Sequence, residues 1–185
     1  MQSGASESTA VTVVVGAPRL EVATRAVGAL SAVAPLHPPE VPSAFPAAAA
    51  PGMHLVGCYG WHALGPGLVV HLYGAPTSAK RQPLGEEGLA GLVGAVVVVA
   101  PDEIEAGRAT LAALEEQGWP YVVALTTPDP SPGVRARLSA ALPTRASVPV
   151  VGCVPGQTAS MQRVVWALIT HTLTPILTDD DEEEL

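Results

Sequence analysis

Short apolar segments of strand type alternate with segments of helical periodicity along most of this chain. Residues 11–15 are β-branched and end at Gly16, and apolar residues then recur at helical spacing from Leu20. Further on, residues 93–100 and 121–125 are near-continuous apolar runs, which are typical of strands buried on both faces of a parallel sheet. The alternation therefore favours an α/β fold.

The two later strands are each followed by a helical signal. Asp102 with Glu105 three residues on predicts a capping box, and Gly118 is expected to end that helix. The Ser-Pro pair at 131–132 predicts a second helix that runs to about Leu142. Each such helix would connect parallel strands by a right-handed crossover.

The middle of the chain breaks this pattern. Residues 53–59 and 68–73 are strand-like, and only residues 60–67 separate them. That connection is too short for a parallel crossover, so an antiparallel hairpin is predicted. Before it, residues 34–52 hold six prolines and are expected to form a long irregular loop.

A last strand is predicted at 148–154, followed by an amphipathic helix. The predicted fold is an α/β three-layer sandwich with a six-stranded, mostly parallel sheet and one antiparallel hairpin strand. We expect one domain over residues 11–173, a disordered N-terminus at 1–10 and a disordered acidic tail at 174–185. The apolar residues that carry the helical spacing are Met161, Val164, Val165, Leu168 and Ile169.

Charge excludes several classes of partner. Of the 17 acidic residues, six lie in residues 179–184, so the remainder holds 11 acids against 9 bases. Such a body offers no basic surface to nucleic acid or to anionic lipid. The chain also shows no export signal and no apolar run of about 20 residues, so we expect a cytoplasmic protein without membrane insertion. The cysteines, Cys58 and Cys153, are expected to be reduced.

Three segments resemble one family of nucleotide-binding proteins. Residues 71–76 (HLYGAP) resemble the third-strand segment of the bacterial MglA-type GTPases and of the small GTP-binding proteins of actinobacterial conservon operons. Residues 121–129 resemble the family's guanine-specificity strand, and residues 148–153 resemble the strand before its last helix. In order and spacing the resemblance covers residues 11–173, and it implies the Ras-like, P-loop NTPase fold.

The phosphate-binding motif of that family is largely missing. A P-loop has the pattern G-x-x-x-x-G-K-[ST], in which lysine neutralises phosphate charge and the hydroxyl binds Mg²⁺. Counted from Gly16, this chain has Glu21, Val22 and Ala23 at the positions of the second glycine, the lysine and the hydroxyl. The single lysine, Lys80, lies beyond the third strand and cannot replace the missing one. A carboxylate at position 21 would repel a triphosphate.

The other family motifs are altered as well. Gly74 stands where the wider family has an aspartate near the metal, and residues 76–78 (PTS) replace Pro-Gly-Gln. Thr126 and Thr127 replace the Asn and Lys of the guanine motif, of which Asp129 alone remains. Asp129 beside two prolines is also an ordinary turn residue, and we favour that interpretation over base recognition. The resemblance thus implies a pseudo-GTPase without catalytic residues and without a cofactor.

We therefore expect a protein-binding signalling or regulatory module. The resemblance implies a Roadblock-type partner that docks near the switch regions. Candidate contact residues are Tyr59 and Trp61, predicted at the hairpin tip, together with Lys80 and Arg81 in the second-switch segment. No metal site is expected, because the five histidines show no ligand spacing.

Two alternatives stay open. In the first, the chain binds GTP or GDP with Mg²⁺, Arg19 standing in for the lysine and Thr24 for the metal hydroxyl. The second alternative is a structural subunit of a larger assembly. The candidate residues of a vestigial nucleotide site are Gly16, Arg19, Thr24, Gly74, Thr126 and Asp129.

Overall fold

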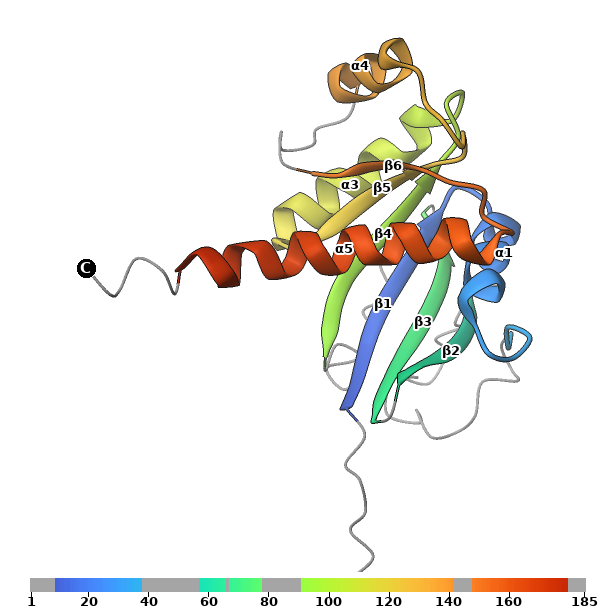
Figure 1. Cartoon of the computed structure of the whole chain (residues 1–185). Helices are drawn as coiled ribbons and strands as arrows, with labels where there is room; N and C mark the ends of the chain where they lie inside the picture. Colours follow the sequence, from blue (N-terminus) through green and yellow to red (C-terminus); the bar gives the residue numbers. More distant parts are fainter. Residues whose placement is uncertain (1–8, 38–56, 66, 78–90, 142–147, 180–185) are drawn as a thin grey trace, which may run out of the picture.

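The computed structural model describes residues 9–37, 57–65, 67–77, 91–141 and 148–179 and confirms the predicted fold class (Figure 1). Its six strands form one sheet in the order β2-β3-β1-β4-β5-β6, in which only the β2–β3 pair is antiparallel. In chain order the elements are β1 (Thr9–Ala17), α1 (Leu20–Leu30), β2 (Cys58–Gly65), β3 (Leu68–Pro76), β4 (Leu92–Val99), α3 (Ile104–Gln117), β5 (Tyr121–Leu125), α4 (Pro132–Ala141), β6 (Val150–Gly152) and α5 (Thr158–Asp179).

Helices cover both faces of the sheet, and each face has its own apolar core. Val96 and Val98 of β4 pack in the cluster formed with α1 and α5, whereas Val97 and Val99 pack with α3 and α4. All four valines are at most 1% exposed. Burial on both faces is the reason that this strand is apolar at nearly every position.

The hairpin is antiparallel as predicted, but its first strand lies later in the chain. Cys58 begins β2, and Gly65 pairs with Leu68, so residues 60–65 belong to the strand and not to the connection. Most of the segment predicted as the first strand, 53–59, falls outside the described residues. The glycines of β2 lower its intrinsic strand propensity, and pairing with β3 overrides that preference.

The predicted capping box before α3 is wrong. The helix begins at Ile104, and Glu103 occupies the N-cap position without a side-chain capping hydrogen bond. The carboxylate of Glu105, expected to reach back to Asp102, instead accepts a hydrogen bond from Arg108 at 3.1 Å. A charged partner one turn ahead thus replaces the capping interaction.

The other predicted helix ends are confirmed. Gly118 ends α3 in the left-handed conformation with φ of 68°. Before α4, the hydroxyl oxygen of Ser131 accepts a hydrogen bond from the amide of Val134 at 3.4 Å. None of the helices in the described part of the chain combines the length and apolarity needed to cross a bilayer.

The described elements extend beyond the domain limits of 11 and 173 predicted from the sequence. The amide of Thr9 donates to the carbonyl of Gly67 at 2.6 Å, so β1 begins there. The last helix, α5, continues to Asp179, and residues 174–179 are therefore helical and not part of the tail. By contrast β6 spans only Val150–Gly152, which pair with Val123–Leu125 of β5, and is shorter than the predicted 148–154.

Candidate functional site

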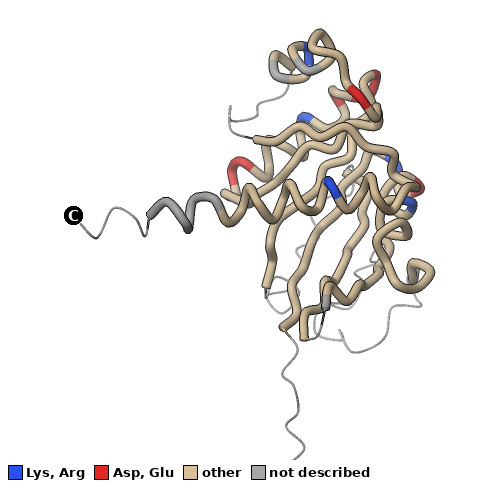
Figure 2. The backbone as a smooth tube through the Cα atoms, in the orientation of Figure 1, with Lys and Arg blue, Asp and Glu red and all other residues tan. Residues whose placement is uncertain are grey.

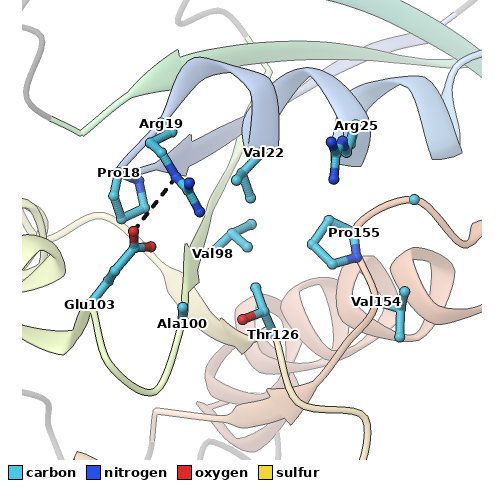
Figure 3. Close-up of a pocket in the computed structure, with 11 residues that line it drawn as sticks. Pro18, Arg19, Val22, Arg25, Val98, Ala100, Glu103, Thr126, Val154 and Pro155 are labelled. Carbon is cyan, nitrogen blue, oxygen red and sulfur yellow. Dashed lines mark ion pairs between the residues drawn. The ribbon is translucent and has the colours of Figure 1, made fainter.

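A cavity of about 340 Å³ opens at the carboxyl ends of the parallel strands (Figure 3). Its walls come from the β1–α1 turn, the end of β4, the turn before α3 and the residues that follow β5 and β6. In the sheet, β1 lies between β3 and β4. The chain that leaves β1 forms β2 and β3 on one side of it, and β4 and the later strands form the other side. Ligands of open α/β sheets bind at such a switch point, so this cavity is the candidate site.

The turn between β1 and α1 is very short. Only Pro18 and Arg19 separate the end of the strand at Ala17 from the start of the helix at Leu20. Proline has no backbone N–H, so Pro18 has no amide to offer a ligand. A phosphate-binding loop is wider than this and presents several backbone amides to its ligand.

The residues that align with the P-loop motif face different surroundings. Glu21 is exposed and is not among the cavity-lining residues, whereas Val22 lines the cavity with an apolar side chain. Ala23 is fully buried in the core beneath α1. The position of the metal-binding hydroxyl therefore faces the sheet and not the cavity.

Charged side chains lie on two sides of the cavity. Arg19 Nε is 3.6 Å from Glu103 Oε1, and this ion pair joins the start of α1 to the start of α3. The two side chains are 63% and 30% exposed, so water weakens the attraction between them. Arg25 lines the same cavity from the second turn of α1.

The remaining wall is mostly apolar. Val98 at the end of β4 and Pro155 after β6 line the cavity, and Thr126 after β5 adds a hydroxyl group (Figure 3). A volume of about 340 Å³ falls at the small end of the range for small-molecule sites. Two guanidinium groups, one carboxylate and one hydroxyl suit a small anionic ligand better than a metal ion.

The structure brings together two of the six residues predicted for a nucleotide site. Arg19 and Thr126 line the cavity from opposite sides. Gly16 lies within β1 and pairs with Ala75 and Val97, so it belongs to the sheet. Asp129 is exposed in the turn after β5 and does not line the cavity.

Thr24 and Gly74, two further predicted site residues, meet on the other side of α1. The Thr24 hydroxyl hydrogen-bonds the thiol of Cys58, and the same thiol lies over Gly74. A Cβ atom at position 74 would stand 2.5 Å from Cys58 Sγ and 3.1 Å from Val27 Cγ2. A side chain at position 74 would therefore be crowded first by Cys58 of β2 and then by α1.

The predicted partner-binding residues are corrected in part. Tyr59 is 8% exposed, and its phenol oxygen lies 2.7 Å from His71 Nδ1, so it is a packed residue and not a surface one. Trp61 is 37% exposed, but it lies in the middle of β2 opposite His71 and not at a hairpin tip. Lys80 and Arg81 fall outside the described residues.

Sequence reasoning missed Glu103, Arg25 and Pro155. A signal existed for Arg25, because Arg19, Val22 and Arg25 recur every three residues and so share one stripe of α1. Glu103 lies between the two residues of the predicted capping box, and the sequence pattern gave it no role. Its pairing with Arg19 depends on the packing of two helices far apart in sequence.

Neither cysteine is a candidate nucleophile. Both are free thiols, 4% and 0% exposed. Burial raises the pKa of the Cys58 thiol, and it raises the pKa of Cys153 to about 11. Thiols in this state are protonated at neutral pH and react slowly. Among the described residues, no group of three His, Cys, Asp or Glu side chains is placed to hold a metal ion.

Comparison with known proteins gives a fold but no family. No protein-family model matches the chain, and no curated protein matches its sequence. Solved structures do match: Era of Aquifex aeolicus bound to GDP·AlF4⁻ shares 8% identity over 88% of this chain and 56% of its own, with a TM-score of 0.54. The chain thus spans about half the length of Era.

Two further structures agree. The G domain of the FeoB iron transporter of T. maritima shares 16% identity over 88% of this chain and 99% of its own, with a TM-score of 0.55. The elongation factor SelB of Methanococcus maripaludis, in complex with a GTP analogue, shares 13% over 91% of this chain and 34% of its own, with a TM-score of 0.51. The chain has the fold of a GTPase G domain.

Proposed function

We propose that this chain is a catalytically inactive relative of the Ras-like GTPases that acts by binding a protein partner. The observation that carries the proposal is the two-residue connection between β1 and α1. A G domain holds its phosphates in the loop at this position, and here the loop consists of Pro18 and Arg19.

The residues around that turn support the same conclusion. Val22 stands at the lysine position and Ala23 at the hydroxyl position, and Ala23 is fully buried. Glu103 places a carboxylate in the cavity and pairs with the Arg19 guanidinium. Removing one electrostatic contact to a transition state typically lowers the rate by about 10²-fold or more. With several contacts changed together, GTP hydrolysis at a useful rate is not expected.

The proposed partner surface is the outer edge of the sheet at β2. Trp61 and Val33 are 37% and 42% exposed there, and the Ser31 hydroxyl accepts hydrogen bonds from the amides of both at 3.2 and 3.3 Å. Residues 26–37 and 57–77 hold no Asp, Glu, Lys or Arg, as Figure 2 shows for this half of the molecule. Interface cores are likewise depleted of charge and enriched in tryptophan.

The resemblance to MglA-type and conservon proteins makes a Roadblock-type protein the partner of choice. The test is titration of the pure chain with such a protein, followed by sedimentation or calorimetry. We expect Trp61→Ala to weaken the complex about tenfold or more. Trp166→Ala on α5 is the matched control, and it should leave the affinity unchanged. Failure of the wild-type chain to associate would contradict the partner assignment.

GTP or GDP binding is the second candidate function. It is favoured by the presence of Arg19, Arg25 and Thr126 around one cavity at the carboxyl edge of the sheet. The proposed metal hydroxyl, Thr24, does not line this cavity, which weakens the candidate.

Two assays distinguish the two functions. The first measures nucleotide that is released when the purified protein is denatured, and the second measures phosphate that the protein releases from GTP. We expect both the released nucleotide and the released phosphate to stay at background. Turnover that Arg19→Ala abolishes would replace the first proposal with the second. Arg108→Ala is the matched control, because Arg108 is an exposed arginine on α3 that pairs with Glu105.

A further inference from the structure

The outer side of α5 carries two exposed apolar side chains that nothing in the proposed function uses. Trp166 is 66% exposed and Leu173, seven residues on, is 47% exposed. Arg163 and Thr170 lie on the same side, at spacings of three and four residues from Trp166. The opposite side of α5 packs on the sheet through fully buried residues such as Met161 and Leu168.

The two ends of α5 differ in charge. Arg163 lies near its first turn, and Figure 2 shows both basic and acidic residues at this end of the molecule. The other end leads into residues 179–184, which are all acidic. This side of α5 therefore presents Trp166 and Leu173, with Arg163 toward its N-terminal end and a run of acids in the sequence at its C-terminal end.

We propose that α5 binds α5 of a second copy of this chain in antiparallel orientation. In that arrangement Trp166 of one copy lies opposite Leu173 of the other, with the two-fold axis between residues 169 and 170. Asp179, the last residue of α5 and the first of six acids in the sequence, is then placed toward the N-terminal end of the other helix, which is the end that carries Arg163 and the positive helix dipole. A parallel pair would instead set six acids against six acids.

A second copy fits this surface better than a membrane does. Six acids at one end would be repelled by anionic lipid headgroups. The antiparallel pair is self-complementary, as a two-fold symmetric interface requires. One helix pair buries less than a standard interface, so a dissociation constant in the micromolar range is expected.

The association is tested by sedimentation over a concentration series. The wild-type chain should form dimers, and Trp166→Ala should raise the dissociation constant about tenfold or more. Arg163→Glu and added salt should both weaken the dimer, because the end contacts are exposed charges. Trp61→Ala, which removes an exposed tryptophan from β2, should leave the dissociation constant of the dimer unchanged. A chain that stays monomeric at about 100 μM, or dimers that Trp166→Ala leaves intact, would overturn the proposal.

Cross-linking tests the orientation. Thr170→Cys places a thiol beside the two-fold axis, so mild oxidation should give a disulfide-linked dimer. Gln162→Cys is the matched exposed control, and in the antiparallel pair its two copies stand about 20 Å apart, too far to bridge. Cys58 and Cys153 are buried and leave a low background. Dimers from position 162 but not from 170 would exclude the antiparallel pair.

Discussion

The interior of the sheet and the loops at its carboxyl edge follow different constraints. In the interior, Val96, Val98 and Val122 are fully buried, and their strands lie in the order shared with G domains. At the edge, the β1–α1 turn is reduced to Pro18 and Arg19. Burial of apolar side chains therefore maintains this fold even where the first loop at the carboxyl edge has only two residues.

The cavity itself shows the same division. Its floor, with Val22 and Val98, continues the apolar core, and its rim holds the exposed Arg19–Glu103 pair. Substitutions in the interior should therefore change stability, whereas substitutions at the rim should not.

The largest effect is expected for Leu72→Ala in β3. Leu72 is 1% exposed and packs in the core beneath α1. Truncation leaves a cavity, and it should lower the free energy of unfolding by about 2–5 kcal/mol. Denaturant titration measures this value. A loss below about 0.5 kcal/mol would show that this half of the sheet is not part of the cooperative core.

Gly74→Ala is expected to be the next in size. The added Cβ would meet Cys58 Sγ at 2.5 Å, and such overpacking costs about 1–3 kcal/mol. Cys58→Ala removes the sulfur, so the double variant should recover part of that loss. If the losses of unfolding free energy of the two single variants simply added in the double variant, the crowding between position 74 and Cys58 would be contradicted.

Alkaline pH should destabilise the protein in part through Cys153. Burial raises the pKa of its thiol from 9.0 to about 11, although the positive charge of Arg163 acts in the opposite direction. The folded state then holds the proton more tightly than the unfolded state, so stability present below pH 9 is lost as the pH rises toward 11. Denaturant titrations from pH 8 upward should show a shallower decline for Cys153→Ala. An unchanged slope would contradict this assignment.

The smallest effect is expected for Arg19→Ala. Its ion pair with Glu103 is largely exposed, so the free energy of unfolding should change by less than about 0.5 kcal/mol. Arg108→Ala, which breaks the exposed pair with Glu105, is the control and should behave alike. A loss above about 1 kcal/mol at Arg19 alone would mean that the rim supports the fold after all.

Most of the fold follows from the sequence because continuous valine runs and helical spacing report burial directly. The β4 strand and the amphipathic α5 helix were predictable for this reason. The β2 strand was misplaced, since Gly60 and Gly65 gain their strand conformation from pairing with β3 and not from local preference.

The candidate site was less predictable. Arg19 and Thr126 were found through the resemblance to the GTPase motifs, and the structure places both at the cavity. Thr24 was misassigned, because the rotation of α1 that turns its hydroxyl toward Cys58 is set by tertiary packing. Tyr59 was expected at the surface, but it is 8% exposed and contacts His71 across the hairpin, which local sequence does not report.

Isothermal titration of the nucleotide-free protein with GTP and GDP, in the presence of Mg²⁺, tests most directly whether this G-domain fold has no nucleotide site. A G-domain fold with a two-residue turn in place of its phosphate loop should show no binding up to about 1 mM, which means a binding free energy weaker than about −4 kcal/mol. Micromolar binding that Arg19→Ala abolishes and Arg108→Ala leaves intact would contradict the account and assign the cavity to a nucleotide.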